Sequence, residues 1–270
     1  YELAPSVQYL VGVIGVLTLL MAGFTALVQN DIKKVLAFST VSQIGYMFLA
    51  LGVGAWSSAV FHLMTHAFFK ALLFLTAGSI ILSMHHEQNI FKMGGLRRDL
   101  PFCFWMFLIG CLALTALPLT SGFFSKEEIL AEALASPDGG YLLWLGGLTG
   151  AFLTGLYSFR LLFLVFFGEK RHAAEEMKGS NLQLPLVILA VFSILGGYIA
   201  LPLDSVFPHA EHEAHPALHY QIIMIAVPML GILLAWYLFV KRKDISDRLA
   251  TDGMGKTLHR FFFSQWGMDW

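Results

Sequence analysis

ALPLTSGFFSKEEIL, residues 116–130, lies inside an apolar stretch that runs from Pro101 to Ala133. As one straight helix this stretch would measure roughly 50 Å, whereas the hydrocarbon core of a membrane is about 30 Å thick. Pro118 cannot continue a helical hydrogen-bond ladder, and Gly122 follows it closely. The sequence therefore predicts one discontinuous helix, broken near its midpoint at Pro118, with Lys126 in its second half.

Two positions for Lys126 are open at this point. Broken helices at membrane depth line a cavity or are buried in protein, and transporters build ion sites there. Alternatively, Ser125 and Glu128 form an S-x-x-E capping box, which is typical of a helix start. An interfacial helix would then begin at Lys126 and hold its amine among lipid headgroups.

Composition indicates the class of protein. The 270 residues are 57% hydrophobic and 13% charged, whereas soluble domains carry about 25% charged residues. Mean hydropathy is +0.70. An all-α integral membrane protein is therefore expected, and a net charge of −1 gives no reason to expect a nucleic-acid partner. Cys103 and Cys111, about 12 Å apart if they share one helix, are expected to be free thiols.

Seven apolar runs are long enough to cross a membrane. They are Val7–Val28, Val35–Val53, Trp56–Met84, Pro101–Ala133, Tyr141–Gly168, Leu184–Leu203 and Ile222–Val240.

The charged residues between these runs alternate in sign. Basic residues follow the first, third, fifth and seventh runs: Lys33, Lys34; Lys92, Arg97, Arg98; Lys170, Arg171, Lys178; Lys241, Arg242, Lys243. The other connections hold a turn at Gly54 or acidic residues: Glu132, Asp138; Asp204, Glu211, Glu213. Because Lys and Arg collect in cytoplasmic loops, this pattern predicts an outer first residue and an inner last residue.

FHLMTHAFFKALLFL, residues 61–75, places His62, His66 and Lys70 at every fourth position of an apolar helix, so they form one polar stripe. Lys70 is roughly 21 Å from either end of its run, too deep to reach the surface. An ionisable residue at that depth is a functional hypothesis by default. Desolvation weakens an amine's preference for its charged form, and neutral histidines with water could pass protons along. The structural alternative is core histidines bonded to a neighbouring Ser or Thr.

Three other polar features have mainly structural interpretations. Arg160 lies about 12 Å from the cytoplasmic end of its run, within snorkelling range. FSTVSQIGY, residues 38–46, is expected to pack helices through Ser and Gly. The loop PHAEHEAHPALH, with His209, His212, His215 and His219, is expected to be a solvated outer loop, although imidazole and carboxylate could also hold zinc.

Four stretches resemble the antiporter-like membrane subunits of proton-pumping NADH:quinone oxidoreductase, respiratory complex I, in particular the distal type called subunit L or chain 5. They are NDIKKVLAFSTVSQIGYM (30–47), HLMTHAFFKALLFLTAGSI (62–80), GGLRRDLP (94–101) and LPLTSGFFSKEEIL (117–130). The resemblance implies a C-terminal half of such a subunit: residues 1–168 as one five-helix inverted repeat forming a half-channel, 169–240 as two additional spans, and 241–270 as a cytoplasmic segment leading to a lateral helix.

The resemblance also implies roles for single residues. Lys70 matches the central lysine of the half-channel and Lys126 its terminal lysine toward the outer face, while His62 and His66 match the connecting histidines. Lys126 is thereby expected in the channel rather than among headgroups. Glu127 stands where relatives carry Asp or Glu, and its role is open.

By the same resemblance, the function is proton translocation coupled to quinone reduction elsewhere in the complex, in a bacterial inner membrane. No redox centre is expected in this chain, with FMN, iron–sulfur clusters and quinone in other subunits. The expected partners are other membrane subunits, especially a neighbouring antiporter-like one, together with lipids, protons and water. Two alternatives remain: a subunit of a multisubunit sodium/proton antiporter, and a structural scaffold in which Lys70 and Lys126 tolerate Leu.

Overall fold

The computed structural model describes residues 4–137, 140–171, 174, 180–199, 201–203, 206–207 and 216–267. This part of the chain is all-helical apart from an isolated bridge between Asp31 and Asn89, which confirms the predicted fold class. The helices are α1 Pro5–Val28, α2 Ile32–Gly52, α3 Trp56–Ser83, α4 Pro101–Leu114, α5 Ser121–Ala135, α6 Gly140–Phe166, α7 Ser180–Leu195, α8 Leu218–Trp236, α9 Lys243–Thr251 and α10 Gly253–Phe263. A 3₁₀ turn, Gly196–Tyr198, follows α7, and a π-helical turn, Tyr237–Lys241, follows α8.

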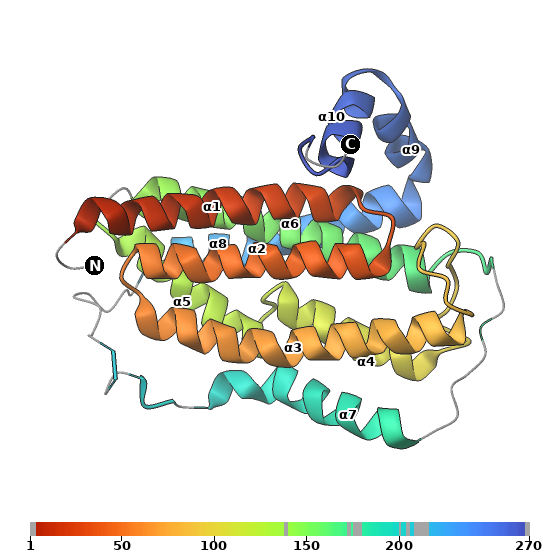
Figure 1. Ribbon diagram of the computed structural model, residues 1–270, viewed down its shortest axis with the longest axis horizontal. Helices are drawn as coiled ribbons and strands as arrows, with labels where there is room; N and C mark the ends of the chain where they lie inside the picture. Colours follow the sequence, from red (N-terminus) through yellow and green to blue (C-terminus); the bar gives the residue numbers. More distant parts are fainter. Residues whose placement is uncertain are drawn as a thin grey trace.

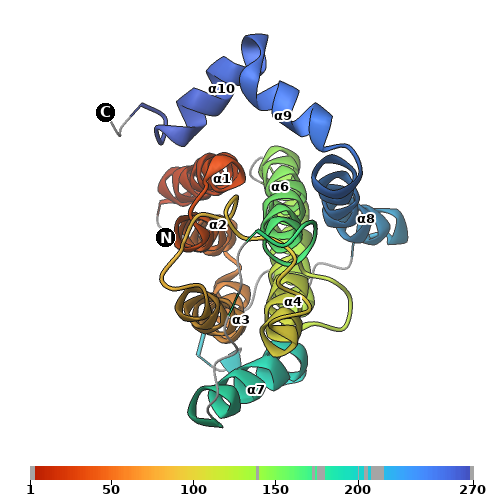
Figure 2. The ribbon, with the colours of Figure 1, turned by 90° about the vertical axis from the view of Figure 1, so that its right-hand side faces the viewer.

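The long helices lie nearly side by side along the longest axis of the molecule (Figure 1). Seen from one end, α1, α2 and α3 form one row, and α6 and α4 form a second row that faces it (Figure 2). Helix α8 packs on the outside of α6, and α7 lies across α3 and α4. Helices α9 and α10 project beyond this bundle, next to one end of α1.

Within the described residues, five helices are long and apolar enough to cross a membrane: Ser6–Val28, Ile32–Gly52, Trp56–Ser83, Gly140–Phe166 and Leu218–Lys241. Their outward faces carry exposed apolar side chains, such as Leu10 and Leu17 on α1 and Leu230 and Leu233 on α8. Lipid solvates such faces as well as protein does, whereas water does not. These five helices agree with five of the seven predicted runs.

The fourth predicted run is two helices, as the position of Pro118 indicated. Helix α4 ends at Leu114 and α5 begins at Ser121. Between them the backbone takes positive φ values at Ala116 (58°) and Leu119 (71°), which end the helical ladder. Gly122 lies in the first turn of α5, where an added Cβ would collide with the carbonyl oxygen of Ala113. Its role is therefore to let the two half-helices approach closely, and not to break the chain.

The sixth predicted run, Leu184–Leu203, is wrong in its extent, because α7 ends at Leu195. Gly196 and Gly197 follow, and a Cβ on either would press against the ring of Phe68 or Phe124. Glycine allows this close approach, and the chain tightens into the 3₁₀ turn there. Helix α7 is consequently shorter than a full span and ends against α3 and α5.

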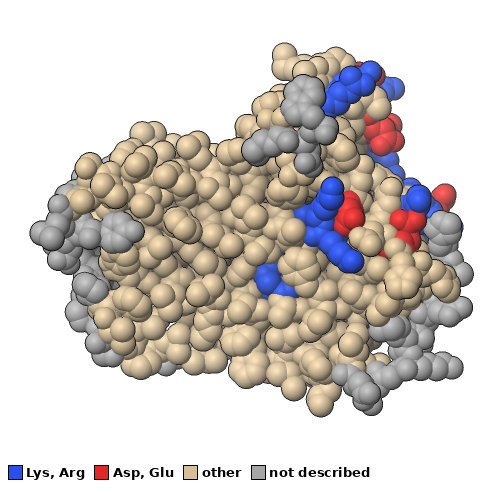
Figure 3. Space-filling model, in the orientation of Figure 1, with Lys and Arg blue, Asp and Glu red and all other residues tan. Residues whose placement is uncertain are grey.

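The basic loops lie together at one end of the bundle. The α1–α2 turn and the loop after α3 bond to each other, with Ile32 N donating to Gln88 O at 3.0 Å and Ile90 N to Asn30 O at 2.9 Å. Figure 3 shows charged side chains gathered at this end and on the projecting C-terminal helices, while most of the remaining visible face is uncharged. The basic residues that follow every second apolar run in the sequence thus lie at one charged end of the bundle. Lys178 lies outside the described residues.

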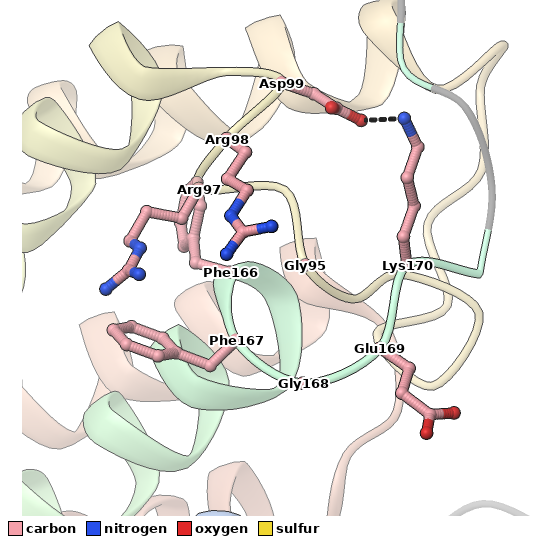
Figure 4. A pocket seen from close by; sticks show the side chains of 9 residues that line it. All are labelled: Gly95, Arg97, Arg98, Asp99, Phe166, Phe167, Gly168, Glu169 and Lys170. Atoms are coloured by element: carbon pink, nitrogen blue, oxygen red, sulfur yellow. Dashed lines mark ion pairs between the residues drawn. The ribbon is translucent and has the colours of Figure 1, made fainter.

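The GGLRRDLP segment fastens the α3–α4 loop to the end of α6 (Figure 4). The backbone N–H of Gly95 donates to Phe167 O at 3.2 Å, and Arg97 lies over the Phe167 ring, 4.9 Å from its centroid. Lys170 and Asp99 form an ion pair of 2.6 Å across a hollow of about 390 Å³. The motif therefore has a structural role at the charged end.

Small residues join α1 to α2, as predicted for residues 38–46. A Cβ on Gly45 would meet the carbonyl oxygen of Gly15, so the two backbones are in direct contact. The Ser42 hydroxyl donates to Leu19 O at 3.1 Å. This close packing holds α2 in a fixed rotation, and that rotation decides which of its side chains face α3.

Candidate functional site

The four residues predicted for the site, Lys70, His66, His62 and Lys126, all lie inside the bundle. Their side chains are 5%, 7%, 0% and 2% exposed, respectively. Three come from α3, where the spacing of four residues keeps them on one face. Lys126 comes from α5, which packs directly against α3. The structure thus brings the stripe and the second half of the broken helix together.

Lys126 occupies the position that the helix break creates. Its amine donates to the carbonyl oxygen of Leu114, the last residue of α4, at 3.2 Å. Carbonyl groups in the last turn of a helix have no partner within the helix, so the break supplies this acceptor. The amine also lies 4.6 Å from the centroid of the Tyr46 ring, whose hydroxyl donates to Gly147 O at 2.5 Å. The alternative in which α5 begins at Lys126 is wrong, since the helix begins at Ser121 and the lysine is buried.

A small cavity adjoins Lys126 on the side away from α3. It has a volume of about 10 Å³ and is lined by Lys126, Glu127 and Pro228, among others. That volume is about what one water molecule requires. Glu127 is partly buried there, so a carboxyl group lies on the route from the lysine toward α8.

His62 contacts α5 through Ser125. Its Nδ1 lies 2.9 Å from the Ser125 hydroxyl, which is 2.8 Å from the Thr65 hydroxyl. This is the contact that the structural interpretation of a core histidine predicted. The same serine precedes Lys126 in the chain, so the contact also couples His62 to the lysine helix. The His62 Nε2 atom is buried and has no partner in the part of the chain that the structure describes.

His66 lies between His62 and Lys70 on the α3 face. Its ring centroid is 6.1 Å from that of His62, and the two rings are inclined by 40°. Phe69 packs edge-on against it, with centroids 5.5 Å apart. The His66 Nε2 atom is buried and likewise lacks a partner among the described residues. A buried ring nitrogen in this state is normally satisfied by ordered water.

Lys70 is held by oxygen atoms of α2. Its amine donates to the carbonyl oxygen of Leu36 at 3.1 Å and to the hydroxyl of Ser39. The Ser39 and Thr40 hydroxyls donate to the same carbonyl, at 2.8 and 3.0 Å. This carbonyl therefore serves several donors within an intact helix.

Among the described residues, neither buried lysine has an acidic partner. Over the described ranges, the ion pairs join Lys92 to Glu87, Lys170 to Asp99 and Arg242 to Asp244, all outside the bundle interior. In the part of the chain that the structure describes, Lys70 and Lys126 thus have neutral oxygen atoms and aromatic rings as their neighbours in bonding distance. A neutral surrounding of this kind can accommodate either protonation state of the amine, as a carboxylate partner would not.

The structure adds Ser39, Tyr46 and Ser125 to the predicted site. Ser39 and Tyr46 are seven residues apart, or about two helical turns, and so share the α2 face toward α3 and α5. Residues 38–46 were interpreted as a packing segment, and Ser42 and Gly45 do pack against α1. The length of this polar run indicates that its side chains cover more than one face of the helix, so that some of them face α3 and α5 rather than α1.

Arg160 is more buried than expected, and most of the histidine loop lies outside the described residues. Arg160 extends toward the charged end but is buried there: its side chain is 4% exposed and donates to Gln29 O, just after α1, at 2.9 Å. His209, His212 and His215 lie outside the described residues. His219 lies in the first turn of α8 and its ring is tilted against that of Tyr220, with centroids 4.1 Å apart. No group of three metal-ligating side chains occurs within the described ranges.

A discontinuous helix beside buried ionisable side chains is the arrangement of ion-transporting membrane proteins. The chain belongs to the NADH:quinone oxidoreductase/Mrp antiporter transmembrane family, whose model matches residues 1–154. Together with its apolar helices, this membership makes it a multi-pass membrane protein.

Curated relatives extend the similarity over the whole chain. NADH-quinone oxidoreductase subunit L of Escherichia coli (strain K12) is 52% identical over 273 residues, which cover 100% of this chain and 44% of that protein. The subunit L of Pseudomonas aeruginosa is 51% identical over 276 residues, with the same coverage. The chain therefore spans less than half the length of these relatives. The solved structure of the Mrp complex from Dietzia sp. DQ12-45-1b is also similar, with a TM-score of 0.68 and 22% sequence identity. The match covers 92% of this chain and 29% of that chain, and it shows a shared fold.

Proposed function

We propose that this chain is part of a subunit of the L type in a proton-translocating NADH-quinone oxidoreductase, and that it carries one proton half-channel. The identity of 52% to a protein of that name supports the assignment to this type. One observation carries the proposal of proton transfer: two lysine amines are buried in the bundle with neutral acceptors only. Such amines can change protonation state without breaking an ion pair.

The order of groups supports a path along the bundle interior. From Lys70 the α3 stripe leads through His66 to His62, and Ser125 links His62 to the helix that carries Lys126. The two histidines have unpaired ring nitrogens, and water between the rings would complete the path. Each transfer leaves a proton on the next nitrogen, so net movement requires that the lysines take up and release protons in turn.

The boundaries and setting follow from the same assignment. We place the half-channel repeat in residues 1–168, two additional spans in 169–240 and a cytoplasmic segment in 241–270, with the charged end of the bundle in the cytoplasm of a bacterium. Electron transfer through FMN, iron–sulfur clusters and quinone belongs to other subunits of the complex. A neighbouring antiporter-like subunit would transmit its effect to Lys70 and Lys126 by changing nearby charge or hydration.

Replacement of Lys126 in the assembled complex tests this function. The variant Lys126→Ala is expected to lower the number of protons moved per electron in sealed vesicles, while quinone reduction with an uncoupler present is retained. Lys92→Ala is the matched control, because Lys92 is an exposed lysine in a loop at the charged end. A wild-type ratio of protons to electrons in Lys126→Ala would refute a role for this lysine.

The second candidate is a subunit of a sodium/proton antiporter, which the family match and the likeness in fold to an Mrp complex favour. Sodium-dependent proton flux in vesicles without NADH or quinone would support it. A purely structural scaffold predicts that Lys70→Leu and Lys126→Leu leave all transport unchanged.

A further inference from the structure

Helices α9 and α10 partly cover an open cavity at the charged end of the bundle. Phe262 of α10 stacks on Phe24 of α1 with centroids 5.0 Å apart, and Trp266 Nε1 donates to Met21 O at 3.2 Å. Beneath them is a cavity of about 260 Å³. Most of its wall is apolar. Among its lining residues are Leu27, Leu156, Phe239, Leu258 and Phe262.

Arg160 reaches this wall from α6 and brings a buried charged side chain to the cavity. Its guanidinium lies between the rings of Phe91 and Phe239, 5.6 and 5.7 Å from their centroids. With the described residues its side chain makes one hydrogen bond, to Gln29 O, although a guanidinium has five N–H donors. No carboxylate lies within ion-pair distance of it in the described part of the chain. A buried cation without a counter-ion is costly, by several kcal/mol in typical proteins.

The other polar groups at the cavity do not neutralise this charge. Asp247 of α9 lines the cavity but is exposed to solvent, and Ser246 is neutral. His259 of α10 also lines it, and burial, with a smaller contribution from Arg160, lowers the pKa of this imidazole. A second cation beside Arg160 is therefore disfavoured in the cavity as it stands.

The location of the cavity indicates what would supply the negative charge. It lies where the ends of α1 and α8 meet two amphipathic helices, which is the depth of lipid headgroups in a membrane. An apolar chamber with one buried guanidinium matches a molecule that has an acyl chain and an anionic head. Guanidinium binds phosphate through two parallel hydrogen bonds.

We infer that this cavity binds an anionic lipid, with its phosphate on Arg160 and part of an acyl chain along Leu156, Leu258 and Phe262. The lipid fixes α9 and α10 to the bundle and supplies the missing counter-charge. This inference does not depend on proton translocation, because none of these residues belongs to the Lys70–Lys126 path.

The test measures phosphatidylglycerol bound to the purified, delipidated complex, by native mass spectrometry or with a radiolabel. Arg160→Gln is expected to weaken binding at this site about tenfold, which corresponds to about 1.4 kcal/mol, as for the loss of one charge-assisted contact. Ala250→Phe, in α9 at the cavity wall, leaves Arg160 in place and fills the chamber, and it is expected to abolish binding there. Arg98→Gln, an exposed arginine at the same charged end, is the matched control and should bind as the wild type does.

Three outcomes would overturn the inference. Wild-type binding in both Arg160→Gln and Ala250→Phe would mean that the cavity holds no lipid. Equal retention of phosphatidylcholine and phosphatidylglycerol would show that the site does not select an anionic headgroup. Displacement of the lipid by inorganic phosphate alone at equal concentration would show that the site takes a free anion and that the acyl chain contributes nothing. Should Arg160→Gln fail to assemble, the result with Ala250→Phe decides.

Discussion

At the scale of single residues, the two buried lysines are held in different ways. Lys126 uses a backbone carbonyl that a helix break sets free, together with the face of Tyr46. Lys70 uses a hydroxyl and a carbonyl of an unbroken helix. Substitution of Ser39 therefore changes a contact of Lys70, and substitution of Tyr46 changes a contact of Lys126.

Ser39→Ala is expected to slow proton-coupled turnover about tenfold, because a hydrogen bond to a charged amine is worth roughly 1.5–3 kcal/mol and each 1.4 kcal/mol is about tenfold. The measurement is the initial rate of NADH-driven proton uptake into sealed vesicles. Ser42→Ala is the control, since Ser42 donates to Leu19 O on α1 and does not touch Lys70. Equal pumping in the two variants would contradict a role for Ser39.

Two substitutions of Tyr46 distinguish the contribution of its ring from that of its hydroxyl. Tyr46→Phe retains the ring over Lys126 and loses only the hydrogen bond to Gly147, so we expect near-normal pumping and a stability loss of about 1 kcal/mol. Tyr46→Leu also removes the ring, and pumping should fall severalfold. If Tyr46→Phe pumps as poorly as Tyr46→Leu, the hydroxyl matters to transfer and the ring assignment is wrong.

At the scale of helices, the close approach of α5 to the end of α4 is what places Lys126 beside the Leu114 carbonyl. That approach depends on Gly122, whose hydrogen atom faces the Ala113 carbonyl. Pro118 explains why the ladder stops, and Gly122 explains how the two halves remain in contact. The element of the fold that matters most to the proposed site is thus a pair of helix ends.

Gly122→Ala should destabilise the subunit by about 1–3 kcal/mol, as overpacking does in well-packed interiors, and lower the yield of assembled complex. Gly78→Ala is the matched control: this helical glycine of α3 has no neighbouring atom within 4 Å of an added Cβ. Alanine there is expected to be neutral or slightly stabilising. Thermal unfolding of the two purified variants compares them directly, and equal melting temperatures would disprove the steric role.

At the scale of the whole molecule, the charged loops meet at one end, and this end fixes the orientation that we propose in the membrane. Cys103 and Cys111 are both buried, so neither side chain in this chain is open to a labelling reagent. Lys92→Cys lies in the α3–α4 loop at the charged end, and Ala135→Cys lies at the far end of α5; both positions are exposed.

A membrane-impermeant maleimide should label Lys92→Cys only from the cytoplasmic side of bacterial cells or vesicles and Ala135→Cys only from the opposite side. Each variant labelled in detergent serves as the control for accessibility. Labelling of both positions from one side would contradict the crossing of the membrane by the α4–α5 pair, and the reverse sidedness would invert the proposed orientation.

Sequence alone determined the all-helical membrane class, the break at Pro118 and the stripe of His62, His66 and Lys70. Each of these is a local property, because hydropathy, proline geometry and helical period act over a few turns of one chain segment. The tertiary structure decided the rest. That Ser39 and Tyr46 face the lysines, that Arg160 points inward, and that α7 ends at Leu195 all depend on how helices distant in sequence rotate and pack, which no single segment encodes.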